Sequence, residues 1–327
     1  MSGGNVYKVG IIGAGEIVET AHLPVLKVLD KAEVIWIVDK NEARCDLISR
    51  MFKVPVIKEE ELARSIAAID ICLLSIPYGA RAAYFQICAE NEIAVYAEKP
   101  FATTIEEHKK LCSIFPPHKL AVGFQRRTYS IVHLLKHLIR DEILGKLEEI
   151  TFIEGYFNLK SGKEYLSNSS LSGGGVIIES AIHALDQILQ ITEADNVILN
   201  SVESLHLNGI DYDSEFGSII KREKGDIPIN CKISSIRNLD NSLEVRFEDA
   251  VVRCSLSSDA VVKVYPNKDS NDCYTFEVNN ADKKQFAFSV NHSFFIFWNE
   301  FISALEKKKE NSTSACTSLL TTHWIDQ

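Results

Sequence analysis

The 327-residue sequence lacks a long apolar run, an excess of basic residues and a low-complexity tract. No stretch of about 18 apolar residues occurs, so the sequence predicts no membrane-spanning helix. The 45 acidic residues outnumber the 35 basic ones, the net charge is −10, and there is no long basic stripe. A chain with this charge balance is poorly suited to binding nucleic acid through phosphates, and it has little attraction to an anionic membrane surface.

The sequence also lacks a C-x-x-C pair among its eight cysteines. Several cysteines stand inside apolar runs, as Cys72 does in the segment ICLLS. We interpret them as reduced, buried thiols in preference to disulfides or a metal site. Met1–Lys8 is polar and has neither the basic start nor the apolar stretch of a secretory signal, so we expect a cytoplasmic protein.

The composition is that of a globular protein, with 46% hydrophobic and 24% charged residues, and the length suits two domains. Residues 1–122 alternate apolar segments with helical patterns, which predicts βαβ units and an α/β domain built on a doubly wound parallel sheet. Ligands of such sheets bind at the carboxyl ends of the strands, so the loops after the strands should line one crevice. The strand-like segments are Val6–Ile12, Glu33–Val38, Ile71–Ser75, Ile93–Ala97 and Leu120–Val122.

The remaining residues, 123–327, show the pattern of an α+β domain. Helical patterns cover 127–143 and 291–309, and the segment 176–191 begins like a strand and continues as a helix. Six strand-like segments within 201–279, separated by turn residues, predict one large, mostly antiparallel open sheet. A second subunit commonly covers such a sheet, so we expect a homodimer or homotetramer.

A glycine turn, Gly13-Ala14-Gly15, joins the first strand-like segment to the first helical pattern. Gly13 permits a tight turn, Gly15 lets backbone N–H groups approach a pyrophosphate, and the N-terminus of the helix favours that anion. Val18 stands where a third small residue is usual, so this dinucleotide fingerprint is incomplete. The alternative is that the glycines serve only the turn.

Asp39 ends the second strand-like segment, 24 residues after Gly15. A carboxylate at this place accepts hydrogen bonds from ribose hydroxyls and disfavours a 2′-phosphate, which predicts NAD as the cofactor. The neighbouring Lys40 could neutralise a 2′-phosphate and leaves NADP as an alternative. Asp39 could instead only cap the next helix.

Several motifs together resemble the Gfo/Idh/MocA oxidoreductase family. They are the GIIGAG start, the segment Thr20–Leu26, the tripeptide Glu98-Lys99-Pro100, and Gly173–Gly175 followed by Glu179-x-x-x-His183-x-x-Asp186. The resemblance covers nearly the whole chain. It implies an N-terminal Rossmann domain, a second domain with a large sheet that commonly mediates oligomerisation, and NAD(P)-dependent oxidation or reduction of a hydroxyl carbon. The substrates it implies are sugars, cyclitols or nucleotide sugars.

The resemblance implies that Lys99 and His183 are catalytic. An ammonium at the mouth of the cofactor crevice can stabilise the charge that develops on the reacting oxygen, and an imidazole can carry the hydroxyl proton. Glu179 and Asp186 lie four residues before and three after His183, so a helix would place all three on one face, toward a crevice. A metal site and a purely structural histidine are the alternatives, and we expect no metal because no further ligand has suitable spacing.

The sequence departs from the family pattern at three positions. Glu179 replaces the usual aspartate, Ala181 replaces a glycine, and Arg81 stands where many relatives carry histidine. The longer Glu179 side chain could re-aim its hydrogen bond to substrate. These departures make the cofactor site a firmer prediction than the substrate site, and they leave the catalytic efficiency open.

The candidate site residues fall into three overlapping groups. The candidate catalytic residues are Lys99, His183 and Glu179; the candidate cofactor-binding residues are Gly13, Gly15, Glu16, Ile17, Asp39, Ser75, Pro77, Glu98 and Lys99; and the candidate substrate-binding residues are Lys99, Arg126, Tyr156, Glu179 and His183. Tyr165 could also stack on a sugar ring, and His22 could touch the cofactor or serve packing.

The function expected from these residues is a dehydrogenase or reductase acting on a small sugar-like substrate. Two alternatives stay open: a protein of the same fold that senses NAD(P) without turnover, and an enzyme that cleaves glycosides while retaining NAD.

Overall fold

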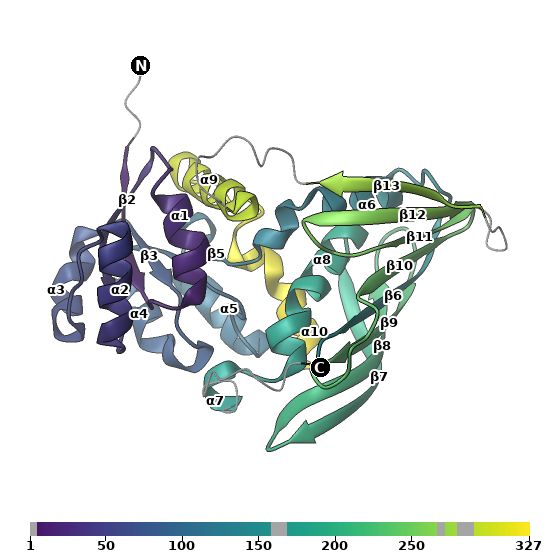
Figure 1. Ribbon diagram of the computed structural model, residues 1–327, viewed down its shortest axis with the longest axis horizontal. Helices are drawn as coiled ribbons and strands as arrows, with labels where there is room; N and C mark the ends of the chain where they lie inside the picture. Colours follow the sequence, from purple (N-terminus) through teal and green to yellow (C-terminus); the bar gives the residue numbers. More distant parts are fainter. Residues whose placement is uncertain (1–4, 158–168, 267–271, 280–290) are drawn as a thin grey trace. The chain divides into compact units, whose positions relative to one another are not determined.

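The computed structural model describes residues 5–157, 169–266, 272–279 and 291–327, and it forms two compact units (Figure 1). The first unit comprises Met1–Gln125 and Asp282–Leu319, and the second comprises Arg126–Ala281 and Leu320–Gln327. The sequence prediction placed everything after residue 122 in one second domain, whereas the structure groups a C-terminal segment with the first unit.

The first unit is built on a five-stranded, fully parallel sheet with the strand order β2-β1-β3-β4-β5. This confirms the predicted doubly wound sheet. The strands are β1 (Tyr7–Ile12), β2 (Ala32–Val38), β3 (Ile71–Leu74), β4 (Ala94–Ala97) and β5 (Leu120–Val122). The α-helices are α1 (Leu23–Leu26), α2 (Glu42–Phe52), α3 (Leu62–Ser65), α4 (Ala82–Glu90), α5 (Ile105–Ile114) and α9 (His292–Lys307). Shorter helical turns are η1 (Val18–His22), η2 (Glu59–Glu61), η3 (Ile66–Ala68), η4 (Tyr78–Ala80), η5 (Pro117–Lys119) and η9 (Ala315–Ser318).

Helix α9 belongs to the first unit because its aromatic face is buried there. Phe297, Trp298 and Phe301 are each at most 1% exposed. The Trp298 ring lies 4.7 Å from the ring of Tyr96 on β4, measured between centroids. Burying large aromatic side chains is among the strongest stabilising contributions a helix can make, so the chain returns to the sheet whose last strand, β5, ends at Val122.

The second unit is built on an eight-stranded sheet with the order β13-β12-β11-β10-β6-β9-β8-β7. Only the β6–β9 pair among these described strands is parallel, so the prediction of a mostly antiparallel sheet is confirmed. The strands are β6 (Leu147–Gly155), β7 (Asn196–Leu207), β8 (Ile210–Lys221), β9 (Ile227–Ser234), β10 (Ser242–Phe247), β11 (Ala250–Cys254), β12 (Asp259–Pro266) and β13 (Tyr274–Asn279). The helices are η6 (Gln125–Thr128), α6 (Ser130–Arg140), α7 (Ser169–Ser172), η8 (Ile177–Ala181), α8 (Ile182–Thr192) and α10 (Leu319–Asp326).

Two details of the second unit differ from the sequence prediction. The segment predicted to begin as a strand at Val176 is helical from its start: η8 is a π-helical turn that leads directly into α8. Strand β7 was not among the predicted strands because most of its side chains are exposed, so no alternation of apolar and polar residues marks it.

All eight cysteines are free thiols, and five of them are buried. Burial raises the pKa of Cys254 to about 12 and raises that of Cys231 still further above its ordinary value. Such thiols stay protonated and unreactive at neutral pH. Cys273 is exposed, contrary to the general expectation of burial. No described helix is long and apolar enough to cross a membrane.

The stability of the first unit should depend on pH through His108 on α5. Its ring is fully buried, its Nε2 bonds the Ala315 carbonyl oxygen at 2.9 Å, and burial lowers its pKa from 6.5 to about 4. The folded state therefore resists protonation that the unfolded state accepts, so stability is fully present above pH 6.5 and is lost as the pH falls toward 4. The loss should amount to about 3 kcal/mol.

Urea unfolding at several pH values tests this expectation. His108→Gln keeps an N–H donor for Ala315 but does not titrate. The free energy of unfolding of the wild type, relative to that of the variant, should therefore fall by about 3 kcal/mol from pH 6.5 to 4. Parallel stability curves for the two proteins would show that His108 does not carry this dependence.

Candidate functional site

The glycine turn after β1 has the geometry expected of a close backbone approach. Gly13 has φ +110°, and a Cβ built on it would lie 2.2 Å from the carbonyl oxygen of Ser75, so only glycine fits. A Cβ built on Gly15 meets no heavy atom within 4 Å among the described residues. Gly15, Glu16 and Ile17 are exposed where the first helical turn begins. The turn therefore leaves open space beside Gly15, and the binding of a pyrophosphate there remains a prediction.

These two glycines make a matched pair for mutation. Gly13→Ala should destabilise the protein by at least about 2 kcal/mol, because the methyl group overlaps the main chain at a positive φ. Gly15→Ala should leave the melting temperature within a few degrees and yet weaken NAD(H) binding by roughly tenfold or more, because its methyl group would stand where the phosphates approach. Thermal unfolding and titration with NADH separate the two effects. Unchanged NADH affinity in Gly15→Ala would contradict binding at this turn.

Asp39, directly after β2, ties the glycine turn to the next loop. Its Oδ2 accepts a hydrogen bond from the Ala14 N–H at 2.6 Å, and its Oδ1 accepts one from the Asn41 N–H at 2.8 Å. Arg44 adds a bond of 3.0 Å from its Nε to the Ala14 carbonyl oxygen. Asp39 thus shapes the turn itself, while the cap of helix α2 comes from the Asn41 side chain. Its contact with a ribose remains a prediction.

Lys99 lies at the carboxyl end of β4, in the loop that the doubly wound sheet directs toward a ligand. Its side chain is half-buried, and the peptide bond between Lys99 and Pro100 is cis. Glu98 precedes it, and the Glu98 carboxylate accepts a hydrogen bond from the ring of His22 at 2.8 Å. A Cβ built on Gly123, after β5, would come within 2.8 Å of this carboxylate, so a side chain at that position would displace the Glu98 carboxylate.

Arg81 joins the loops after β3 and β4. Its side chain is 4% exposed and donates from Nε to the Ile76 carbonyl oxygen at 2.8 Å. Its Nη1 donates to the carbonyl oxygens of Glu98 and Pro100, the two residues that flank Lys99. The sequence showed Arg81 only as a departure from the family pattern, because no local signal predicts where a buried guanidinium donates.

The loop after β3 holds the predicted residues Ser75 and Pro77, both half-buried. The Ser75 N–H donates to the Ile12 carbonyl oxygen at 2.9 Å, which continues the pairing of β1 with β3. Tyr78 follows and donates its hydroxyl proton to the Glu107 carboxylate. Burial, together with that carboxylate, raises the pKa of Tyr78, which keeps the phenol protonated at neutral pH.

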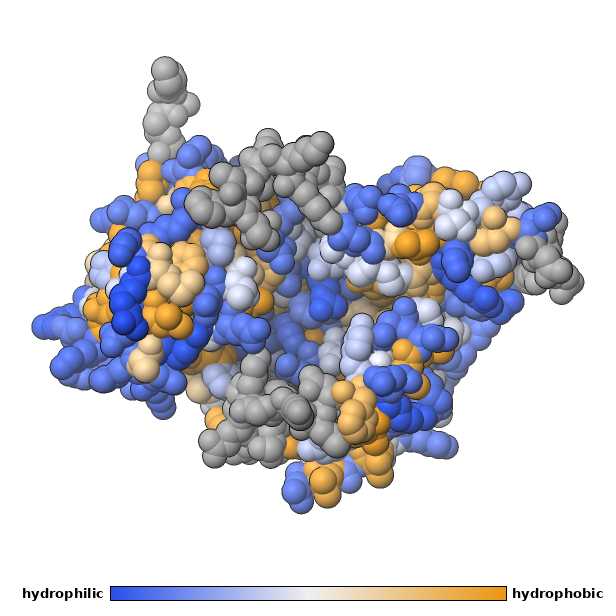
Figure 2. Space-filling view, viewed as in Figure 1, coloured by the Kyte–Doolittle hydropathy of each residue, from blue (hydrophilic) through white to orange (hydrophobic). Residues whose placement is uncertain are grey.

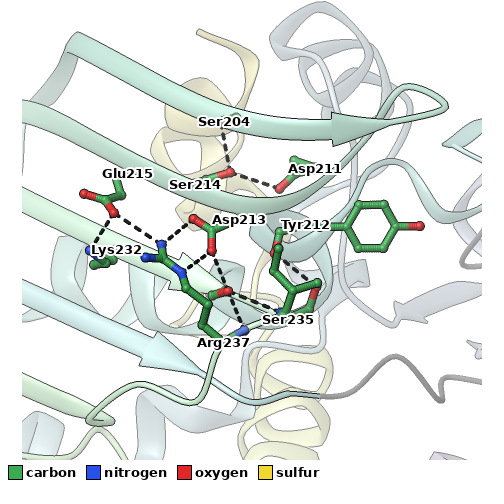
Figure 3. A network of polar contacts seen from close by, with 11 residues as sticks. Ser204, Asp211, Tyr212, Asp213, Ser214, Glu215, Lys232, Ser235 and Arg237 are labelled. Carbon is green, nitrogen blue, oxygen red and sulfur yellow. Dashed lines mark hydrogen bonds and ion pairs between the residues drawn. The ribbon is translucent and has the colours of Figure 1, made fainter.

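In the second unit, the glycine run before helix α8 is shaped by Asp211 at the start of β8. The Asp211 carboxylate accepts hydrogen bonds from the N–H groups of Gly175 at 2.9 Å and Ile177 at 3.0 Å (Figure 3 shows Asp211 beside Ser214). A Cβ built on Gly175 would lie 2.0 Å from the Asp211 carbonyl oxygen. Asp211 was not predicted, because nothing near it in the sequence marks it as the partner of this turn.

Helix α8 carries His183, but its polar residues differ in exposure. Glu179 lies within the π-helical turn and is exposed, whereas His183 is 6% exposed. The π turn changes the helical register, so the spacing of an α-helix does not apply between these two residues. Exposure therefore differs along the predicted polar stripe, and its direction toward a crevice remains a prediction.

Asp186 is 1% exposed and is fully engaged in the interior of the second unit. Arg127 donates from Nε and Nη2 to its two carboxylate oxygens at 2.7 and 2.6 Å, and the Thr321 hydroxyl donates to it at 2.8 Å. The bidentate pair joins η6 to α8, and the Thr321 hydrogen bond joins α10 to α8. Asp186 and Arg127 thus have a structural role that the sequence left open.

The remaining predicted substrate residues are also in the second unit. Arg126 is half-buried in η6, and its carbonyl oxygen accepts a bond from Gln187 Nε2 at 3.3 Å. Tyr156, just after β6, is 57% exposed. Tyr165 lies outside the described residues. No group of three or more described His, Cys, Asp and Glu side chains is placed to hold a metal ion, and the absence of a metal remains a prediction.

A separate hollow of about 380 Å³ lies on the sheet of the second unit. It is lined by residues of β6 to β9, among them Glu215, Gly217 and Lys232, and by none of the predicted site residues. Figure 3 shows Lys232 and Arg237 directed toward Glu215, and these contacts lower the pKa of the Glu215 carboxyl. The hollow therefore carries an ion-pair network on a sheet surface and no candidate chemistry.

Two curated dehydrogenases are similar to this chain over more than half of its length. A D-xylose 1-dehydrogenase [NADP(+)] from Haloarcula marismortui is 23% identical over 262 residues, which are 76% of this chain and 72% of that protein. A scyllo-inositol 2-dehydrogenase (NADP(+)) from Bacillus subtilis is 26% identical over 215 residues, 64% of this chain and 58% of that protein.

The fold also matches solved structures. The crystal structure of an aldose-aldose oxidoreductase from Caulobacter crescentus, complexed with glycerol, superposes with a TM-score of 0.83 at 16% identity, covering 98% of this chain and 96% of that one. The family model described as oxidoreductase family, NAD-binding Rossmann fold, matches residues 7–124. Residues 7–124 therefore form a NAD-binding Rossmann domain of the Gfo/Idh/MocA oxidoreductase family, as the sequence motifs indicated.

Proposed function

We propose that this protein is an NAD(P)-dependent oxidoreductase that transfers a hydride between nicotinamide and a hydroxyl-bearing carbon of a sugar, cyclitol or nucleotide sugar. The observation that carries the proposal is the pairing, in one unit, of an open glycine turn at Gly15 with Lys99 at the carboxyl end of β4. The named activities of the similar proteins, on xylose, inositol and aldoses, support the substrate class.

The cofactor fits the residues present in the first unit. Gly13 makes the turn, Gly15 leaves space for the pyrophosphate, and Glu16 and Ile17 begin the helix whose N–H groups face it. Asp39 holds the turn in place and presents a carboxylate near the end of β2. We propose that Asp39 favours NAD, with NADP as the alternative that Lys40 could accommodate. Nicotinamide, when bound, supplies the hydride acceptor or donor.

In this proposal Lys99 and His183 have different roles at the reacting carbon. The Lys99 ammonium hydrogen-bonds the reacting oxygen and stabilises the negative charge that develops on it. A ring nitrogen of His183 takes the hydroxyl proton during oxidation and returns it during reduction. The burial of His183 limits competing exchange with water. Glu179, Arg126 and Tyr156, which are more exposed, are the proposed contacts for the remaining substrate hydroxyls.

A substrate panel tests this function. The purified protein is mixed with NAD⁺ or NADP⁺ and with aldoses, inositols and nucleotide sugars, and the absorbance of reduced nicotinamide is followed. The proposal predicts reduction with at least one class. Tight cofactor binding without turnover on any substrate would instead favour the sensing protein that the Glu179 and Ala181 departures suggest. Product release without net reduction would favour glycoside cleavage with retained NAD.

We further propose that the sheet of the second unit joins copies of this chain into a homodimer or homotetramer. Several large apolar side chains are exposed on its outer strands, and Figure 2 shows hydrophobic surface on this unit. They are Ile198, Val202, Leu205 and Leu207 on β7, Val261 on β12, and Tyr274 and Phe276 on β13. Light scattering after size-exclusion chromatography measures the assembly state, and a monomer at all concentrations would refute the proposal.

A further inference from the structure

His22 is a fully buried histidine that the proposed reaction does not use. It ends the π-helical turn η1, and its ring is 0% exposed. Three aromatic rings surround it edge-on, with centroid distances of 5.1 Å to Tyr96, 4.9 Å to Phe294 and 6.0 Å to Trp298. Such a sealed imidazole must satisfy both of its ring nitrogens within the protein.

The partners of the two ring nitrogens define the tautomer of His22. The indole N–H of Trp298 lies 3.1 Å from Nδ1, and an indole nitrogen can only donate. Nδ1 therefore carries a lone pair, and the ring proton sits on Nε2. From there it donates to Oε1 of Glu98 at 2.8 Å. Trp298, His22 and Glu98 thus form a hydrogen-bond chain with one direction, from helix α9 to the end of β4.

Glu98, the final acceptor of this hydrogen-bond chain, directly precedes Lys99 in the sequence. Its carboxylate is fixed by His22, and its main-chain oxygen accepts from Arg81, which also binds the Pro100 carbonyl oxygen. The carboxylate is packed against Gly123, which has no side chain to displace it. The backbone on both sides of Lys99 is therefore held, and the long lysine side chain starts from a fixed point.

We propose that His22 is a positioning residue for Lys99, and that Trp298 locks His22 in the one tautomer that can donate to Glu98. The inference rests on the proposed function of Lys99. It gives the Thr20–Leu26 segment and helix α9 a role in catalysis that requires no contact with cofactor or substrate. Loss of the Trp298 N–H should loosen Glu98 and lower the rate of the chemical step while the glycine turn, elsewhere in the unit, still binds cofactor.

The first experiment is independent of turnover. Histidine labelled with ¹⁵N is incorporated, and the His22 signals are assigned by comparison with His22→Gln. The wild type should show a protonated Nε2 and an unprotonated Nδ1 at pH 7. Trp298→Phe keeps an aromatic ring, smaller than the indole, but has no N–H donor, so His22 should become a mixture of its two tautomers. A wild-type ring protonated on Nδ1, or on both nitrogens, would overturn the proposed chain.

The second experiment measures the effect on catalysis. Trp298→Phe should lower kcat roughly 10- to 100-fold, as small misplacements of a catalytic group do, while KM and the Kd for NADH change less than about twofold. Phe301→Leu, on the same helix, is the matched control for lost aromatic packing and should lower stability without this selective loss of kcat. His22→Gln retains an N–H donor and an acceptor, so it should keep more activity than His22→Ala.

The two experiments separate the possible failures. If the His22 ring signals change in Trp298→Phe but kcat does not, the positioning role is wrong although the hydrogen-bond chain exists. If the wild type turns over no sugar, the proposed function fails, and the ¹⁵N signals still decide whether Trp298 sets the tautomer.

Discussion

Lys99→Met and His183→Asn should each lower kcat/KM for the sugar substrate by about 10²- to 10⁴-fold. Lys99→Met removes the ammonium that stabilises the reacting oxygen, and His183→Asn removes the group that carries the proton. His183 is not a candidate cofactor contact, so the Kd for NADH of His183→Asn should stay within about threefold of the wild type, whereas Lys99→Met should also weaken NADH binding to the extent that the ammonium contacts the cofactor. Initial rates and NADH titration measure the two quantities on the same preparations.

Two surface variants provide matched controls for this result. Lys110→Met removes an exposed ammonium from α5, and His137→Asn removes a half-exposed imidazole from α6. Both should leave kcat/KM within about twofold, since solvent-exposed charges and ion pairs contribute little. If Lys99→Met and His183→Asn also retain full activity, the assignment of both residues is wrong.

Asp186→Ala should destabilise the protein by about 3–5 kcal/mol. The substitution leaves the Arg127 guanidinium, whose side chain is 5% exposed, without the carboxylate that compensates its charge, and it removes the acceptor of the Thr321 hydroxyl. Chemical denaturation monitored by fluorescence measures the loss, because Trp324 lies on the same helix as Thr321.

The double variant Arg127→Met/Asp186→Leu distinguishes a lost ion pair from general damage to the core. Replacing both charges with apolar groups removes the cost of an uncompensated buried charge, so the double variant should be more stable than Asp186→Ala by about 2 kcal/mol or more. If the double variant is the less stable of the two, the uncompensated charge is not the source of the effect.

Much of the fold was predictable because the parallel strands of the first unit are short, fully buried apolar segments. Ile71–Leu74 and Ala94–Ala97 are buried along their whole length, and both stand between clear helical patterns. The start of η8 was mispredicted for a related reason. A run of apolar residues such as Val176 and Ile177 has no period of its own, and the carboxylate that accepts the Ile177 N–H at the start of η8 belongs to Asp211, which is distant in sequence.

The candidate site residues were predictable where they directly follow the carboxyl end of a parallel strand, because ligands bind at that edge of the sheet. Gly13 and Lys99 follow strand ends, and the doubly wound sheet gives such positions their meaning. The supporting contacts were not predictable, since they join residues far apart in the chain. Trp298 and His22 are 276 positions apart, and Asp186 meets Arg127 across 59. The sequence periodicity that suggested a polar stripe on α8 contains no information about such partners.

The most direct test of the account is the fate of hydrogen at the reacting carbon. A substrate identified in the panel is prepared with deuterium on its carbinol carbon and incubated with the enzyme and oxidised cofactor, and the reduced cofactor is examined by NMR. We predict one deuterium at C4 of the nicotinamide, on a single face, and its near-complete loss in Lys99→Met at equal incubation time. Deuterium that never reaches the cofactor, while the substrate is still converted, would contradict hydride transfer as the function of this protein.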